Sequence, residues 1–280
     1  MSTGMFKPVH GAHAVVETVF FFEFAAPILS DEAIEEHLPA AYADILARAD
    51  KAGSIEVSFD AATQVSSQRE IFTYTFSNGG DEETEAPEWA VRITDGIQVS
   101  IHCTAYTRWD AVSKQAFQFL DKLAKHAQVA LDLRSLGFKV VDQFRYEPSE
   151  GPYDLRMLCN PNSSYLSRKN FESGDRWHNN SGWFWGHPNG KQILNHLNVN
   201  SSAVAVQHKA PHTYVTIDHV QVLRREEDRD TLLCSVDAEQ FSRVAHEFFE
   251  PLHDQNKLVI NDLLTEEACR RLNLVVGGKQ

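Results

Sequence analysis

The sequence predicts an α+β protein of two sheet-and-helix units, in which a long helix covers each antiparallel sheet. Short β-branched and aromatic runs come first, and a long helical pattern begins at Trp109. The same succession returns as strands over about 183–222 and a helix from Asp237. Between them, 147–170 holds three Pro and several Ser and Asn without a sustained period, which is typical of a connection. The predicted organisation is an N-terminal unit over 1–147, a connecting segment over 148–170 and a C-terminal unit over 171–280.

Local signals define the elements of the first unit. Residues 15–24 are β-branched and aromatic, which predicts a strand, and one in the middle of its sheet. Ser30 and two following acids mark a helix start, with a kink or restart at Pro39. Asp95-Gly96 lies between two alternating runs and predicts a hairpin turn. The helix from Trp109 carries its apolar face through Leu131 and is expected to end at Gly137, before a strand over 138–146.

Signals in the second half are similar. A short helix is possible over 152–158, and the long helix from Asp237 contains Pro251 as a kink. Thr265, followed by two Glu, predicts the cap of a last helix.

Composition excludes several classes of protein. The net charge of −13 gives no basic footprint, so general nucleic-acid binding is not expected. The N-terminal apolar run is interrupted by Glu17 and Glu23 and predicts no signal peptide, and no segment has the length of a membrane span. Four scattered Cys without a CxxC pair predict free thiols in a reducing cytoplasm. We therefore expect a soluble cytoplasmic protein.

The stretch 176–190 holds three of the five Trp and predicts a partner or ligand surface. Asn179-Asn180-Ser181-Gly182 and Pro188-Asn189-Gly190 are expected to be turns. Between them, Trp183 and Trp185 would share one face of a short strand, and Phe184 would point to the other. One face can pack on the protein's own helix. The other is expected to cover a partner chain, a second copy or a ligand, with His187 nearby, or else to lie under the loop 147–170.

Thirteen His raise the question of a metal site, but none is predicted. His178, His187 and His196 are spaced by nine, which fits ligands neither on one strand nor on one helix. His253, beside Asp254 on the closing helix, is a weak candidate for a general base, against a half-buried His that makes one structural hydrogen bond. Arg145 and Tyr146 are weak candidates for a pocket between the units, against an outward Arg on an edge strand.

Four segments in order resemble a sporadically distributed family of bacterial conserved-hypothetical proteins. They are AVVETVFFFEFAAPILSDEAI, YTRWDAV with LGFKVVDQF, DLRMLCNP, and PLHDQNKLVINDLLTEE. One departure is Ile260, where the family pattern has an aromatic residue, and 165–215 matches no part of the pattern. The resemblance implies an intracellular α+β protein without a settled activity, with no cofactor and no catalytic residue. A patchy distribution is usual for genes on mobile or defence islands.

The function expected from these observations is that of a non-catalytic binding or interaction module, with a regulatory role or an association with bacterial immunity and defence. A protein partner or a homo-oligomer is expected, and a small-molecule ligand is possible. One alternative is a hydrolase acting on a nucleotide or other small molecule in a cleft between the units. Another is an obligate subunit in a complex with the product of a neighbouring gene. No cofactor is predicted.

Overall fold

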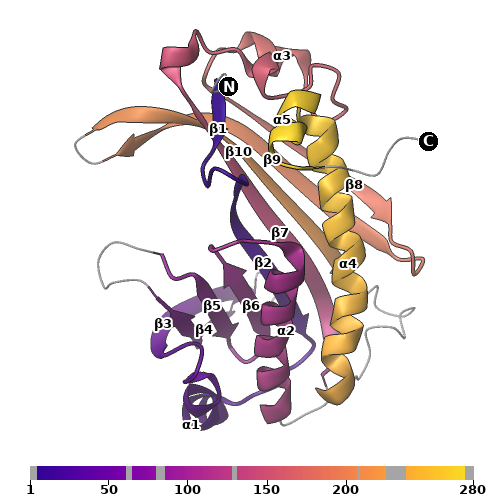
Figure 1. Cartoon of the computed structure of the whole chain (residues 1–280). Coiled ribbons are helices and arrows are strands. Elements are labelled where there is room, and N and C mark those ends of the chain that lie inside the picture. The colour runs from indigo at the N-terminus through magenta and orange to yellow at the C-terminus, as the bar shows by residue number, and fades with distance from the viewer. Residues whose placement is uncertain are drawn as a thin grey trace. The chain divides into compact units, whose positions relative to one another are not determined.

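The computed structural model describes residues 5–60, 65–79, 86–127, 131–206, 209–224 and 238–274. The fold is β-rich, with 44% of the described residues in strands and 30% in helices, and its strands form one large antiparallel sheet. The strand order is β3-β4-β5-β6-β2-β7-β10-β9-β8, and β1 pairs with β7 beside this path (Figure 1). The prediction of two sheets, each covered by its own helix, is therefore wrong.

The elements have the following bounds. The strands are β1 (Phe6–Pro8), β2 (Val15–Phe24), β3 (Arg48–Asp60), β4 (Val65–Asn78), β5 (Trp89–Thr94), β6 (Gln98–Cys103), β7 (Leu133–Tyr146), β8 (Trp177–Gly186), β9 (Gln192–Val206) and β10 (Lys209–Arg224). The helices are α1 (Asp31–Tyr42), α2 (Trp109–His126), η1 (Pro148–Glu150), η2 (Leu155–Met157), α3 (Arg168–Glu172), α4 (Ala238–Leu263) and α5 (Glu266–Arg271).

The error in fold class has a physical origin. Local periodicity shows which segments are strands, and the hairpins β3–β4, β5–β6 and β9–β10 pair neighbours in the chain. The two pairings that make one continuous sheet join strands that are far apart in the sequence, because β2 lies beside β7 and β7 lies beside β10. Such pairings between distant segments depend on backbone hydrogen bonds that every strand offers, so no local signal announces them.

The chain divides into two compact units that are interleaved along the sequence. Unit 1 comprises 1–18, 138–223 and 248–280, and unit 2 comprises 19–137 and 224–247. The elements β2, β7 and α4 each contribute residues to both units. The expected boundaries at 147 and 171 both fall inside unit 1.

Unit 2 confirms several local predictions and corrects others. The side chain of Ser30 accepts a hydrogen bond from the Ala33 N–H and caps α1, which contains Pro39. Asp95 and Gly96 both have positive φ and turn the chain between β5 and β6, as predicted.

The C-terminal limit predicted for the helix from Trp109 is wrong. α2 ends at His126, Leu131 forms an isolated bridge outside it, and Gly137 lies within β7. Lys125 lies in the last turn, where its positive charge interacts favourably with the C-terminal end of the helix dipole. Apolar spacing that continued by chance past His126 led to the longer prediction.

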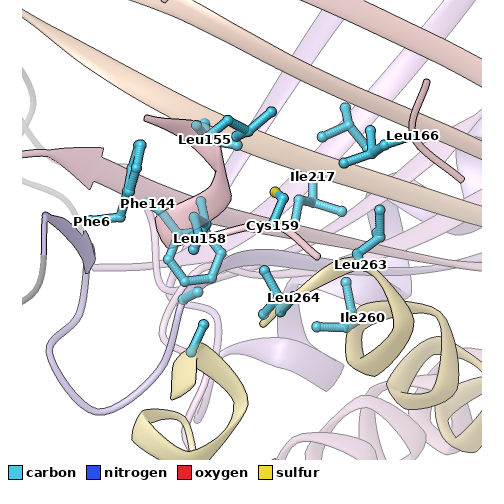
Figure 2. Packing of buried hydrophobic residues seen from close by; sticks show 14 of the residues in the cluster. Phe6, Phe144, Leu155, Leu158, Cys159, Leu166, Ile217, Ile260, Leu263 and Leu264 are labelled. Atoms are coloured by element: carbon cyan, nitrogen blue, oxygen red, sulfur yellow. The ribbon is translucent and has the colours of Figure 1, made fainter. Parts of the chain in front are cut away.

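The core of unit 1 joins the sheet to three covering segments. Phe6 and Phe144 pack with Leu155, Leu158 and Cys159 from the segment after β7 (Figure 2). Residues at the end of α4 and in α5 complete the cluster, among them Ile260, Leu263, Leu264 and Ala268. The side chain of Thr265 accepts from the Ala268 N–H and caps α5, which confirms the predicted helix start. This core fixes the segment 148–170 against the sheet.

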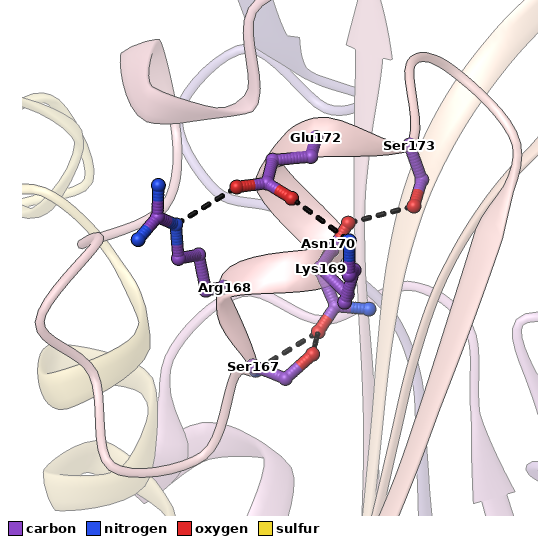
Figure 3. A network of polar contacts seen from close by, with 6 residues as sticks. All are labelled: Ser167, Arg168, Lys169, Asn170, Glu172 and Ser173. Carbon is purple, nitrogen blue, oxygen red and sulfur yellow. Dashed lines mark hydrogen bonds and ion pairs between the residues drawn. The ribbon is translucent and has the colours of Figure 1, made fainter.

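A short polar network determines how the chain enters β8. In α3, the Asn170 side-chain oxygen accepts from both the backbone N–H and the hydroxyl of Ser167 (Figure 3). Glu172 pairs with Arg168 and Lys169, and the Ser173 hydroxyl donates to the Lys169 carbonyl. Asp175 then accepts a hydrogen bond from Ser201 of β9 at its backbone carbonyl. The start of β8 thus follows a hydrogen-bonded turn of α3 and is bonded to β9 through Ser201.

Candidate interaction site on strand β8

Strand β8 alternates strictly between half-buried and exposed residues. Trp183 and Trp185 are half-buried on one face, and Phe184 is 67% exposed on the other, as the sequence predicted. The turn expected over 179–182 is wrong, because these residues pair in register with Val199 to His196 of β9. Asn and Gly favour turns in isolation, but a long partner strand satisfies their backbone groups in extended conformation.

The inner face of β8 lies under the connecting segment. The Trp183 ring is 4.7 Å from the Tyr165 ring and stacks at 5.8 Å on His219 of β10. The side-chain amide of Asn179 donates to the Tyr165 carbonyl, and the Trp177 indole donates to the Tyr153 hydroxyl. The segment 148–170 therefore covers the face that holds Trp183, and Phe184 points away from it.

His187 belongs to the turn that joins β8 to β9. Its N–H donates to the Lys191 carbonyl, and its Nδ1 accepts from the Asn189 N–H. The predicted turn over 188–190 is confirmed, with Gly190 at positive φ. The ring packs 5.3 Å from Phe248 of α4, and burial lowers its pKa. His187 is thus a buried turn residue, and its side chain is not part of an exposed surface.

A buried polar layer lies between α4 and strands β9 and β10. His219 Nε2 is 3.1 Å from Asn195 Oδ1, and His219 Nδ1 is 2.8 Å from Asn256 Oδ1. All three side chains are buried. Gln221 belongs to the same layer and donates its amide to the Leu252 carbonyl of α4.

Hydrogen bonding fixes the tautomer of His219. Asn195 uses its amide NH₂ to donate to the Ile193 carbonyl, so its oxygen faces His219 and accepts from Nε2–H. Burial lowers the His219 pKa to about 4, so the ring is neutral and Nδ1 holds a lone pair. The Asn256 atom drawn at Nδ1 is Oδ1, but a neutral imidazole cannot donate from both nitrogens. We therefore assign the Asn256 amide in the reversed orientation, with its NH₂ donating to Nδ1. The three side chains form one directed chain of hydrogen bonds.

His253 lies on the inner face of α4 and is 5% exposed. Burial, followed by the charge of Lys257, lowers its pKa to about 3. Its Nδ1 lies 3.9 Å from the carboxylate of Asp254, whose side chain is exposed. A base with so low a pKa accepts protons poorly near neutral pH, so this environment favours a structural role.

Arg145 and Tyr146 are both engaged within unit 1. The Arg145 guanidinium pairs with Glu147, with Nη2 2.6 Å from Oε1. The Tyr146 hydroxyl donates to the Gly151 carbonyl at 2.6 Å, and its ring packs on Phe6. These contacts hold the chain where β7 leads into η1. Arg145 and Tyr146 contact the chain after β7, His253 lies on α4, and Trp183 packs on Tyr165 and His219. The contacts found for these residues do not join them into one site.

Asp142 was missed by sequence reasoning. It is buried on the same face of β7 as Phe138, Val140 and Phe144, and burial raises its pKa to about 7. The period of two along 138–144 was the available signal, since it places Asp142 in an otherwise apolar row.

The two edges of the sheet are chemically different. β3, at one end of the strand order, carries five charged residues (Arg48, Asp50, Lys51, Glu56 and Asp60). β8, at the other end, has no Asp, Glu, Lys, Arg or Pro in ten residues and pairs with β9 without a register shift. Charge, Pro and bulges are the devices that normally keep an edge strand from pairing with another chain. β8 lacks all of them.

Within the described ranges, no group of three His, Cys, Asp or Glu side chains is arranged to hold a metal ion. None of the helices in this part of the chain combines the length and apolar character needed to cross a bilayer. No protein-family model matches the chain, and a search of curated proteins finds no match.

Proposed function

We propose that this chain is a non-catalytic protein-interaction module that binds its partner by strand pairing along β8. The observation that carries the proposal is the unprotected edge of β8, a ten-residue strand whose alternate residues direct their backbone N–H and C=O groups away from β9. Phe184, exposed beside this edge, would add an apolar anchor.

The polar residues of unit 1 support a binding role over a catalytic one. His219, Asn195 and Asn256 bond to one another inside the core, and Arg145 and Tyr146 bond to neighbouring chain. A catalytic base needs both a suitable pKa and access to substrate, and His253 is buried with its pKa lowered to about 3.

We place this module in the bacterial cytoplasm. The buried free thiols of Cys159 and Cys269 support a reducing compartment. We also propose membership of the sporadic bacterial family, which the four ordered motifs of the sequence support.

Photo-crosslinking in cells tests the proposed function. A photoreactive amino acid replaces Asn180, an exposed residue of β8, and a matched variant carries it at Asn198, directly opposite on β9 and also exposed. We expect a discrete protein adduct from position 180 and much less from position 198, because β8 lies at an edge of the sheet whereas β9 is paired on both sides. Mass spectrometry identifies the adduct. Absence of any protein adduct at position 180 would show that β8 is not an interaction site.

A further inference from the structure

We propose that the strand bound by β8 is β8 of a second copy of this chain, paired antiparallel with Ser181 on the two-fold axis. This inference rests on the proposed function and names its partner. Closed two-fold pairing requires a surface that is complementary to itself, which most strands are not. The sequence of β8 can be tested for this property residue by residue.

In this register, aromatic residues of one copy face aromatic residues of the other. Trp177 lies opposite the second copy's Trp185 on the inner face, and His178 lies opposite its Phe184 on the outer face. Cross-strand aromatic pairs of this kind stabilise antiparallel sheets. Moving the axis by one residue to Gly182 would place Gly186 opposite His178 and lose both pairs.

Polar and small residues also match. Asn179 lies opposite Trp183, whose indole N–H can donate to the amide oxygen, and exposed Asn180 lies opposite Gly182, which leaves room for it. Ser181 meets itself on the axis. Its hydroxyl is buried and has no hydrogen-bond partner among the described residues, and a second Ser181 hydroxyl can supply one.

Charge favours β8 over the other edge for contact between identical chains. Each copy carries a net charge of −13, so two copies repel, and a seam with like charges face to face would add to that repulsion. β8 carries no formal charge, whereas β3 carries five charged residues. Two copies can therefore approach along β8 at a lower electrostatic cost than along β3.

The first test compares two double variants by solution mass. Asn180→Lys with Gly182→Lys sets lysines of the two copies opposite each other at the seam. His196→Lys with Asn198→Lys places the same charges on the residues of β9 that pair with Gly182 and Asn180, on the same exposed face. We expect wild type and the β9 variant at twice the 31.6 kDa of the chain, and the β8 variant at 31.6 kDa. Thermal melts confirm that both variants are folded.

The second test examines the register by disulfide formation. It uses a Cys234→Ser background, because Cys234 is the one cysteine of the sequence that is not among the three buried ones, Cys103, Cys159 and Cys269. Ser181→Cys should give a covalent dimer on oxidation, because the two sulfurs meet on the axis. His178→Cys is the control, since the two copies of residue 178 lie six residues apart along the seam. Equal crosslinking of both variants, or of neither, contradicts the register.

The outcomes separate this inference from the proposed function. A wild-type mass of 31.6 kDa would show that the chain does not form a dimer. A dimer that persists in the β8 lysine variant would show that the two copies meet at another surface. Either result overturns the second copy as the partner of β8. If position 180 then crosslinks to a different protein, β8 remains an interaction site for another chain. If position 180 crosslinks to nothing, the proposed function fails as well.

Discussion

His219 Nε2 lies 3.1 Å from Asn195 Oδ1, inside the buried polar layer between α4 and strands β9 and β10. The two side chains come from adjacent strands, β10 and β9, and Asn256 of α4 bonds to the other ring nitrogen. This chain of bonds ties the helix to the sheet at one defined position. Apolar contacts alone would permit sliding, so the bonds specify where α4 sits on β9 and β10.

Replacing His219 should destabilise the protein strongly. His219→Ala leaves the amides of Asn195 and Asn256 buried without their shared partner and opens a cavity beside Trp183. We expect a loss of about 3 kcal/mol in the free energy of unfolding, measured in urea. His196→Ala, at an exposed position of β9, should change it by less than about 0.5 kcal/mol. Equal effects of the two variants would contradict the structural role of His219.

Acid should weaken the fold through the buried histidines. Unfolding restores the ordinary His pKa of 6.5, whereas the folded pKa of His253 is about 3 and that of His219 is about 4. The stability contributed by each ring is complete above pH 6.5. It falls by about 1.4 kcal/mol for each pH unit below 6.5, because only the unfolded chain takes up the proton. This loss ends near the folded pKa.

Urea titrations from pH 7 to pH 4.5 check this dependence. His253→Gln should show a slope shallower than wild type by about 1.4 kcal/mol per pH unit. His196→Gln should run parallel to wild type, because residue 196 is exposed. A His253→Gln slope equal to that of wild type would show that the folded ring titrates normally.

Asp142 should act in the opposite direction. Its pKa is raised from 3.8 to about 7, so its contribution is complete below pH 3.8 and is lost as the pH rises to 7. Asp142→Asn removes that loss and should stabilise the protein at pH 8 relative to pH 4, by up to roughly 4 kcal/mol. Asp254→Asn, at an exposed site on α4, serves as the control and should show little change. Melting temperatures at the two pH values provide the comparison.

The two turn glycines Gly96 and Gly190 should respond differently to alanine. Both have positive φ, which costs an L residue about 1–2 kcal/mol. At Gly96, a Cβ would also overlap the Leu29 carbonyl oxygen, whereas at Gly190 it would meet open space. We expect Gly190→Ala to lose about 1 kcal/mol and Gly96→Ala roughly 3 kcal/mol or more in urea unfolding. Similar losses would mean that Leu29 moves aside readily.

Sequence reasoning succeeded where a feature depends on a few neighbouring residues. The caps at Ser30 and Thr265 and the turn at Asp95-Gly96 each use side chains or φ values that only certain residues supply. The opposite orientation of Trp183 and Phe184 follows from the period of two in any strand.

The remaining features depend on partners that are distant in the chain. The sheet became continuous through the β2–β7 and β7–β10 neighbours, which no short motif specifies. Residues 179–182 looked like a turn because the pairing with β9 could not be seen. The candidate site was predicted only in part. The aromatic residues of β8 were identified, but its position at the sheet edge, and the layer around His219, required the strand order.

The interleaving of the two compact units has a consequence for synthesis on the ribosome. Unit 2 needs residues 224–247, and unit 1 needs residues 248–280, so neither is complete while most of the chain emerges. The long strands β2 and β7 are made early and wait for α4, which supplies the last segments of both units. A nascent chain therefore exposes apolar strand surface until translation is nearly finished. Such a protein places its greatest demand on chaperones late in translation, and a truncation before α4 takes residues from both units at once.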